Sequence, residues 1–267
     1  MNNREIKRRI ASVKETVKIT RAMYSISVAK MLKGRAALPA AERFYEEATA
    51  LLARIATRDS AFFLERGRRA AFIVIGGDKG LCGDYNDRVV QEAIRALSER
   101  EERYLFTVGT VTRDKLAKAG FEPDMEFLHS ADNPSPEAAY SIAADLVALF
   151  KEDLLDEIRM VYSSVTDNRS EPVTELLVPF VGEAEDPLRE APTTGAVRHA
   201  VYAYLAAAVY RGLLSSSLAE HLARVRAMPQ ATENGENMIA DLTAKYNKVR
   251  QEGITRALQD VSTPTDR

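Results

Sequence analysis

The stretch IKRRIASVKETVKITRAMYSISVAKM, residues 6–31, decides the fold of this chain. Apolar or small residues recur in it at alternating steps of four and three. They are Ile6, Ile10, Val13, Val17, Thr20, Tyr24, Ser27 and Met31. This spacing predicts a helix with a narrow apolar stripe of coiled-coil type. Because such a stripe needs a partner, we expect this helix to lie along a second helix.

The same stretch is strongly basic. Residues 1–35 hold ten Lys or Arg against two Glu, a net charge of +8, whereas the whole chain carries −2. The remaining residues therefore carry −10. This asymmetry suggests a basic element that works against something acidic, although most charged helix faces are simply solvated. A nucleic-acid role would also fit a basic arm, but no set of stacking aromatic residues accompanies it.

The composition excludes several other classes. The chain has one cysteine, Cys82, so no intramolecular disulfide can form. With one cysteine and three scattered histidines we expect no zinc site. No apolar run reaches transmembrane length, and the charged N-terminus lacks the apolar core of a secretory signal. We therefore expect a folded protein with no membrane-spanning segment.

The middle of the chain alternates between two periodicities. Short apolar or β-branched runs predict strands, at 70–77, 104–110, 124–129, 157–167 and 173–181. Helical patterns lie between them, at 87–100, at 112–119 and from the Ser135-Pro136 start signal onward. This alternation predicts a mostly parallel, doubly wound, Rossmann-like sheet whose last strand pair is antiparallel.

A long second helix is predicted after the acidic linker at 182–195. One apolar stripe comprises Leu218, Leu222 and Val225, and another comprises Ile239, Leu242, Tyr246 and Val249. The fold class is therefore α/β plus long helices: an antiparallel coiled coil of N- and C-terminal helices with an inserted Rossmann-like α/β domain. The expected limits are an N-terminal coiled-coil helix at 1–58, an α/β domain at 68–190, a C-terminal coiled-coil helix at 195–261 and a polar tail at 262–267.

The loop GGDKGLCG, residues 76–83, follows a predicted strand and precedes a helix, as phosphate-binding loops do. It lacks the Gly-Lys-Ser/Thr ending of a P-loop, and its glycine spacing is not G-x-G-x-x-G. We therefore favour a tight structural turn whose glycines adopt positive φ. The residues of this structural loop are Gly80, Leu81, Cys82 and Gly83, with Cys82 as a small buried residue.

Three separated motifs carry a family resemblance. IKRRIASVKETVKITRAM near the start, GDKGLCGDYN at 77–86 and ATENGENMIADLTAKYNKVRQEGIT at 231–255 resemble the gamma subunit of F-type ATP synthases. The resemblance implies a central-stalk rotor subunit without chemistry, cofactor or metal of its own. Its implied partners are the alpha and beta subunits of the catalytic ring, the epsilon subunit and the ring of c subunits. It also implies a peripheral location on the cytoplasmic face of a bacterial inner membrane.

The resemblance assigns contact residues as well. It implies that Lys18, Arg21 and Met23 face acidic loops of the beta subunits. It implies that Arg250 and Gln251 contact other beta loops near the end of the C-terminal helix. These side chains would equally suit an ordinary polar surface of a coiled coil.

The chain departs from the family at three places in the second helix. Proline occupies position 229, glycine occupies positions 235 and 253, and the tail STPTDR is polar. Proline and glycine are unfavourable inside helices, so we expect a bend or a broken hydrogen bond within one turn of Pro229 and a softer helix beyond it.

Two other classes stay open. An enzyme would use the α/β domain for a nucleotide, with GGDKGLCG as its only recognisable loop. A coiled-coil scaffold or nucleic-acid-binding protein would use the basic N-terminal helix.

Overall fold

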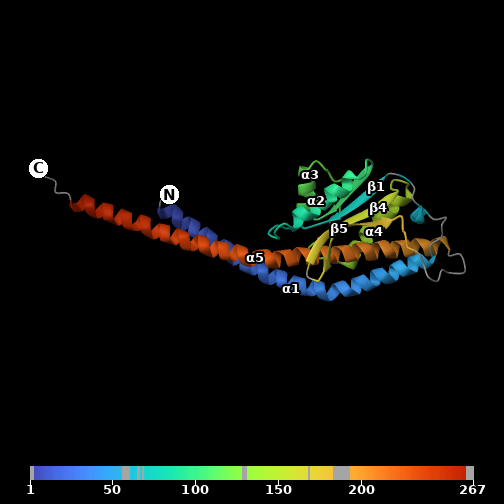
Figure 1. The fold of residues 1–267 in the computed structure, drawn as a ribbon, viewed down its shortest axis with the longest axis horizontal. Coiled ribbons are helices and arrows are strands. Elements are labelled where there is room, and N and C mark those ends of the chain that lie inside the picture. Colours follow the sequence, from blue (N-terminus) through green and yellow to red (C-terminus); the bar gives the residue numbers. More distant parts are fainter. Residues whose placement is uncertain are drawn as a thin grey trace. The chain divides into compact units, whose positions relative to one another are not determined.

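A computed structural model describes residues 3–55, 61–64, 67, 69–127, 131–167, 169–182 and 193–262. Figure 1 shows two long helices and a sheet flanked by shorter helices. In chain order the elements are α1 (Asn3–Ile55), a 3₁₀ turn (Ala61–Phe63), β1 (Ala70–Ile75), α2 (Tyr85–Ser98), β2 (Arg103–Val108), α3 (Thr110–Lys118), β3 (Met125–Glu126), α4 (Pro136–Lys151), β4 (Glu157–Thr166), β5 (Arg169–Val178) and α5 (Thr194–Ser262).

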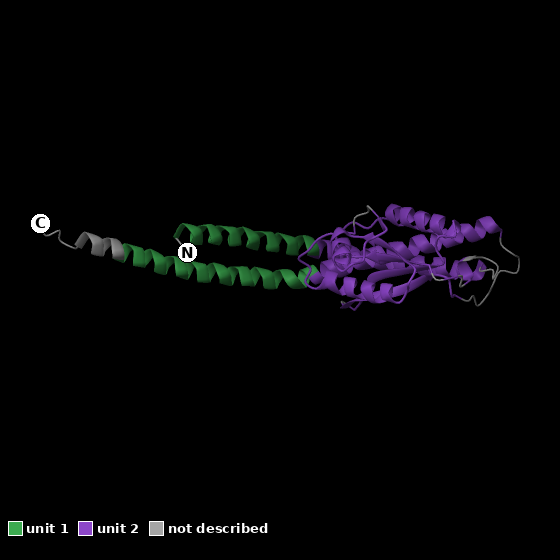
Figure 2. Cartoon of the chain, turned by 90° about the horizontal axis from the view of Figure 1, so that it is seen from above, with its two compact units in different colours: residues 1–27, 224–267 green, residues 28–223 purple. Residues whose placement is uncertain are grey.

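Contacts divide the chain into two compact units, coloured separately in Figure 2. The two-helix unit comprises residues 1–27 and 224–267, and the α/β unit comprises residues 28–223. Both long helices contribute residues to both units. The domain limits predicted from the sequence separate helices from the α/β region, whereas the two units are separated by contacts between residues. The polar tail from residue 263 lies outside the described residues.

The sheet has the order β3-β2-β1-β4-β5. β1 pairs in parallel with β2 and β4, β2 pairs in parallel with β3, and β5 closes the sheet antiparallel to β4. This confirms the predicted mostly parallel sheet with an antiparallel last pair. β1 is buried along its whole length, as a central strand covered on both faces should be.

Successive residues of β1 face opposite sides of the sheet. Ala71, Ile73 and Ile75 pack with α4 and α5 in one apolar cluster. Phe72 and Val74 pack with α2 in the other. Figure 1 shows α2 and α3 on one side of the sheet and α4 with α5 on the other. This two-sided burial is why the strand reads as a continuous apolar run.

The ends of two helices follow the predicted signals. Ser135 caps α4 by accepting a hydrogen bond from the Ala138 N–H at 3.2 Å, and Pro136 occupies the first helical position. At the end of α3, Gly120 adopts a φ of 87°, and the N–H of Phe121 bonds back to the Leu116 carbonyl. That pair of features is the Schellman ending of a helix.

Two strands, β3 and β5, differ most from their predicted ranges. β3 comprises only Met125 and Glu126, and residues 128–130 of the predicted strand lie outside the described residues. β5 begins at Arg169 rather than at 173, because β4 turns back on itself directly after Thr166 and Asp167, whose φ is 47°. Polar residues at 169–172 concealed this part of the strand, since it is the exposed edge of the sheet.

The second long helix begins at Thr194 and contains Pro229. Proline carries no N–H, so one backbone hydrogen bond of the helix cannot form there. Helical geometry is nevertheless present on both sides of Pro229, and the preceding Met228 is almost fully buried. The predicted bend itself stays a prediction. Among the described residues, no helix combines the length and apolar character that crossing a membrane requires.

Candidate functional site

The two-helix unit consists of an antiparallel pair formed by the start of α1 and the end of α5. Thr20 hydrogen-bonds to Thr232 at 2.7 Å, Arg21 forms an ion pair with Glu236, and the Lys7 ammonium lies 5.3 Å from the ring centroid of Tyr246. Residue numbers therefore increase along α1 in the direction in which they decrease along α5. The predicted antiparallel pairing is confirmed, and Figure 2 shows the two segments side by side.

The two helices are closely packed at Gly235. A Cβ added to Gly235 would lie 2.5 Å from Cγ2 of Val17, which is nearer than two carbon atoms can pack. One turn away, Thr20 is buried and bonds both to Thr232 and to the carbonyl of Val17. The glycine therefore provides the space in which the two backbones come together, in addition to its cost in helix propensity.

The predicted contact residues of α1 lie on or beside the outer surface of this pair. The side chain of Lys18 is 71% exposed and pairs with Glu15 at 2.9 Å. That of Arg21 is 65% exposed and reaches across to Glu236 on α5. Met23 is half-buried. Lys18 and Arg21 lie one turn apart on the same side of α1, whereas Met23, two residues beyond Arg21, lies on another side of the helix.

Arg250 and Gln251 form a separate group. Both are exposed on α5. Since Lys7 lies beside Tyr246, the antiparallel register places residue 250 beside the first turns of α1 rather than beside Lys18. The predicted contact residues therefore make two groups on the two-helix unit, separated by about four helical turns.

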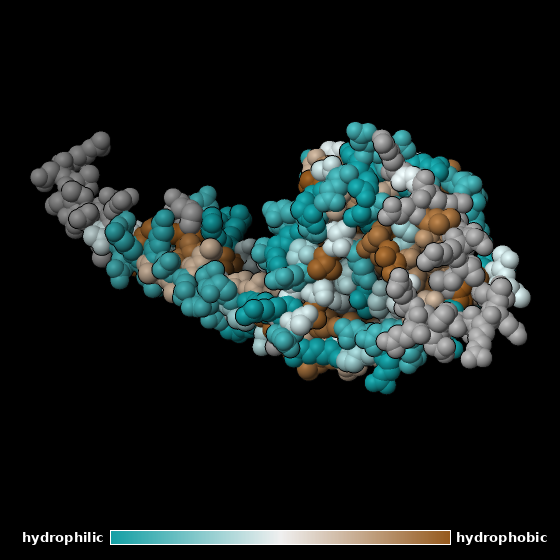
Figure 3. All heavy atoms as spheres, turned by 45° about the vertical axis from the view of Figure 1, so that its right-hand side comes forward, coloured by the Kyte–Doolittle hydropathy of each residue, from teal (hydrophilic) through white to brown (hydrophobic). Residues whose placement is uncertain are grey.

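The seam differs from the predicted stripe at one position. Tyr24, which the spacing placed in the seam, is 40% exposed, while Met23 is half-buried. Sequence reasoning also missed two exposed apolar residues, Ile19 and Ile26, which are 55% and 57% exposed. With Met23 they follow steps of four and three, so they form a second stripe outside the seam. Figure 3 shows apolar atoms among hydrophilic ones on this part of the molecule.

The loop at 77–83 is filled by the side chain of Asn86. Its Oδ1 accepts the Gly77 N–H at 3.1 Å, and its Nδ2 donates to the Lys79 carbonyl at 3.2 Å. Thr112 Oγ1 also accepts from the Gly77 N–H, at 3.1 Å. A phosphate-binding loop instead directs such backbone donors at the ligand. Here the Gly77 donor already bonds to neighbouring side chains.

Positive φ in this loop falls on different residues from those predicted. Gly83 adopts a φ of 60°, as expected, but the other left-handed residue is Leu81, at 61°, and not Gly80. The Leu81 side chain is 56% exposed and Cys82 is buried. The turn buries the Cys82 sulfur, which accepts a hydrogen bond from the Asn86 amide at 3.3 Å.

The parts of the chain that the structure describes contain no group of three or more His, Cys, Asp or Glu side chains placed to hold a metal ion.

Comparisons with known proteins agree along nearly the whole chain. The ATP synthase family profile matches residues 2–264. The ATP synthase gamma chain of Caldanaerobacter subterraneus is 32% identical, with 98% of this chain and 99% of that protein covered. The gamma chain of Halothermothrix orenii is 30% identical, with 97% and 96% covered.

Solved structures share the fold. The rotor of the Euglena gracilis mitochondrial ATP synthase matches with a TM-score of 0.71 at 17% identity, covering 94% of this chain and 98% of that one. The central stalk and c-ring structure of the Tetrahymena thermophila enzyme matches with a TM-score of 0.57 at 22% identity, covering 80% and 99%.

The fold and the exposed helix pair define a class of protein in which the first and last helices pair with each other and a doubly wound sheet is inserted between them in the sequence. The profile match and two relatives at 32% and 30% identity narrow that class to one family. The chain belongs to the ATP synthase family, among its gamma chains.

Proposed function

We propose that this chain is the central rotor subunit of an F-type ATP synthase. It couples ion flow through the membrane sector to ATP synthesis or hydrolysis on a ring of alpha and beta subunits. The observation that carries the proposal is an antiparallel helix pair with a charged outer surface, in a chain that matches gamma chains over nearly its full length.

The contact surface is the outside of the two-helix unit. Lys18, Arg21 and Met23 on α1, and Arg250 and Gln251 on α5, contact the beta subunits. Lys18 and Arg21 are well exposed and positively charged, which suits acidic partner loops. Charges attract without interdigitating, so they favour contact at many rotation angles, whereas close-packed apolar surfaces would favour one angle.

The chain is a non-catalytic subunit. Its relatives are named as chains of an ATP synthase, and the backbone donor of Gly77 is already bonded within its own loop. We therefore expect the isolated chain neither to bind ATP tightly nor to hydrolyse it. Activity changes should appear only when it assembles with partners.

The remaining partners are the epsilon subunit and the ring of c subunits, on the cytoplasmic face of a bacterial inner membrane. A solved neighbour in Euglena gracilis is described as an assembly of OSCP, F1 and c-ring, and it matches with a TM-score of 0.73 at 18% identity. The relatives come from bacteria such as Caldanaerobacter subterraneus.

Reconstitution tests this function directly. The purified chain is mixed with matching alpha and beta subunits, and the stoichiometry and ATPase activity of the product are measured. We expect one copy per complex and a strongly raised ATPase activity. ATP hydrolysis by the chain alone, or no complex with alpha and beta, would refute the proposal.

A charge-removal pair tests the surface. K18A/R21A is compared with R43A/K118A, which removes two basic side chains from exposed positions in the α/β unit. We expect the first pair to lower turnover of the assembled complex and the second pair to leave it unchanged. Equal effects of the two pairs would contradict the assignment of Lys18 and Arg21.

A further inference from the structure

Two carboxylates of the sheet layer, by which we mean β1–β5 with α2–α4 (residues 70–178), each contact both long helices. The first is Glu175, on the edge strand β5. Its Oε1 accepts a hydrogen bond from the Tyr45 hydroxyl of α1 at 2.8 Å. Its Oε2 forms an ion pair with Arg211 of α5. One side chain of the sheet layer thus bonds to both helices.

The second is Asp132, in the segment before α4. Its Oδ2 lies 2.5 Å from Lys30 Nζ of α1 and 2.8 Å from Lys79 Nζ of the loop after β1. Its Oδ1 lies 3.2 Å from Nε2 of His221 on α5. The backbone carbonyl of Asp132 also accepts a bond from Lys30, at 3.2 Å. Asp132 therefore repeats, at a second level, the arrangement around Glu175.

Both carboxylates are largely shielded from water. The side chain of Asp132 is 13% exposed and that of Glu175 is 25% exposed. The Arg211 guanidinium also lies 4.0 Å from the ring centroid of Tyr45, which covers it. Shielded, charge-assisted hydrogen bonds are stronger and more directional than exposed ion pairs.

The pKa values of Asp132 and Tyr45 keep Asp132 ionised and Tyr45 protonated at neutral pH. Burial acts to raise the pKa of Asp132, but hydrogen bonds and charges from Lys30 and Lys79 outweigh it and lower the pKa to about 2. Burial raises the pKa of Tyr45, and the neighbouring Glu175 raises it further, so the hydroxyl keeps the proton that it donates. The bonds of Asp132 to Lys30 and of Tyr45 to Glu175 therefore do not depend on a proton exchanged near neutral pH, whereas the contact of Asp132 with His221 is an ion pair only when the imidazole is protonated.

Apolar packing between the sheet layer and the two long helices differs between the surroundings of Glu175 and those of Asp132. Near Glu175 a large apolar cluster joins sheet and helices through residues such as Ala48, Leu52 and Leu205. Near Asp132 the buried members of the local apolar cluster all belong to α1 and α5; they are Leu38, Ala41, Leu214, Leu218 and Leu222. From the sheet layer the partly buried Val165 of β4 packs against this cluster, and Asp132 adds a directed bond to the sheet layer there.

We propose that Asp132 and Glu175 are positioning residues that fasten the sheet layer to both helices, so that torque applied to the sheet layer turns the helix pair. This inference rests on the proposed rotor function. Apolar contacts are non-directional, whereas directed bonds at two separated positions along the helices oppose pivoting of the sheet layer about either position. Removing both should let the sheet layer yield under load.

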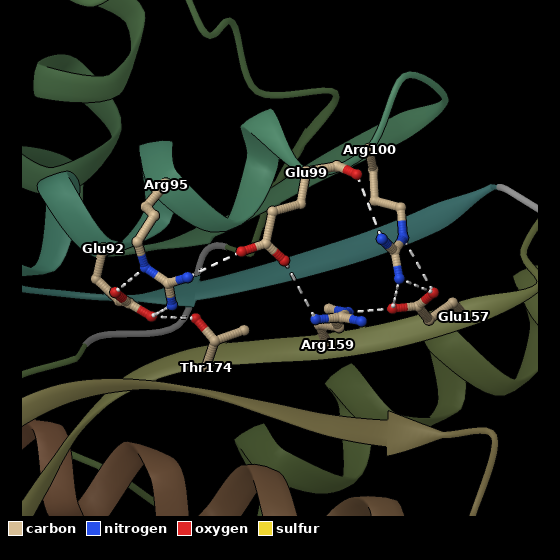
Figure 4. Close-up of polar contacts among 7 residues, drawn as sticks. All are labelled: Glu92, Arg95, Glu99, Arg100, Glu157, Arg159 and Thr174. Atoms are coloured by element: carbon tan, nitrogen blue, oxygen red, sulfur yellow. Dashed lines mark hydrogen bonds and ion pairs between the residues drawn. The ribbon is translucent and has the colours of Figure 1, made fainter.

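The chain offers a matched control within the same sheet layer. Figure 4 shows a polar network of Glu92, Arg95, Glu99, Arg100, Glu157, Arg159 and Thr174. Its members lie on α2, in the turn after it, on β4 and on β5, and not on α1 or α5. Glu92 and Glu157 have side chains 15% and 11% exposed and pair with arginines. They match Asp132 and Glu175 in charge and burial but fasten only the sheet layer to itself.

The test compares D132N/E175Q with E92Q/E157Q in the complete synthase, reconstituted into lipid vesicles. ATP hydrolysis and ATP-driven ion pumping are measured on the same vesicles, together with the melting temperature of each purified chain. In D132N/E175Q we expect the ratio of pumping to hydrolysis to fall by about threefold, as charge-assisted bonds become neutral bonds of about half the strength. We expect E92Q/E157Q to keep the wild-type ratio.

Two results would overturn the inference: an unchanged ratio in D132N/E175Q, or an equal fall in both double variants. If D132N/E175Q does not assemble, D132N and E175Q are measured singly, where a smaller fall in each supports the inference and a wild-type ratio in both refutes it. Failure of the proposed function looks different, because the wild-type chain itself would then form no complex with alpha and beta subunits.

Discussion

The two compact units are stabilised in different ways. In the α/β unit every residue of β1 is fully buried, and apolar clusters fill both faces of the sheet. Among the residues of the two-helix unit whose burial is described, few side chains are buried; they are Ile6, Val17, Thr20, Ser27, Arg224 and Met228. The α/β unit is therefore specified by its core, and the helix pair by a thin seam and a few polar contacts. A thin seam leaves most of the helix surface free to face partners.

The largest expected loss of stability follows a substitution in the core of the α/β unit. Phe72 is fully buried in β1, so Phe72→Ala should lower the free energy of unfolding by about 3–5 kcal/mol. Ile10→Ala removes a half-buried side chain from the seam of α1 and should cost less. Urea unfolding followed by circular dichroism measures both. Equal losses would show that the seam is as stabilising as the core.

A pH effect should follow from Asp132 in the α/β unit. Its folded-state pKa, about 2, lies below the ordinary value of 3.8, so it contributes stability that is present above about pH 4. That contribution is lost as the pH falls through the folded-state pKa. We expect the unfolding free energy of the wild type to decline more steeply from pH 4 to pH 2 than that of D132N. Parallel curves would show that Asp132 has no such role.

Two glycines of α5 should respond with opposite sign. Gly235→Ala would place a Cβ 2.5 Å from Val17, so its overpacking, typically about 1–3 kcal/mol, should outweigh the helix propensity that alanine gains. Gly253 has no heavy atom within 4 Å of its added Cβ, so Gly253→Ala should stabilise the helix by about 1 kcal/mol. Thermal melting followed by circular dichroism compares them. If both substitutions stabilise the chain, the close packing of the two helices at Gly235 is contradicted.

The smallest effect on stability belongs to the proposed contact surface. Lys18→Ala and Arg21→Ala each remove one exposed ion pair, which contributes about 0–1 kcal/mol. We expect the melting temperature of the double variant to stay close to that of the wild type. A large drop would mean that these charges stabilise the helix pair rather than serve a partner.

Local patterns predicted much of the fold. Strands such as β1 and caps such as Ser135 depend on neighbouring residues, so periodicity and start signals indicate them directly. The edge strand β5 was only partly predicted, because its exposed first half carries polar residues. The exposed stripe of Ile19, Met23 and Ile26 follows helical spacing and was present in the sequence, but the stronger seam beside it hid it.

The sequence by itself determined the two long helices, the doubly wound sheet between them and the gamma-chain family, since these depend on periodicity and on motifs read within one segment. Only the tertiary structure decided that Tyr24 leaves the seam, that the helices pack closely at Gly235, and that Asp132 and Glu175 each contact both helices. Tyr45 and Glu175 lie 130 residues apart in the chain. Contacts between such distant segments depend on the register in which elements pack, and local sequence patterns do not encode that register.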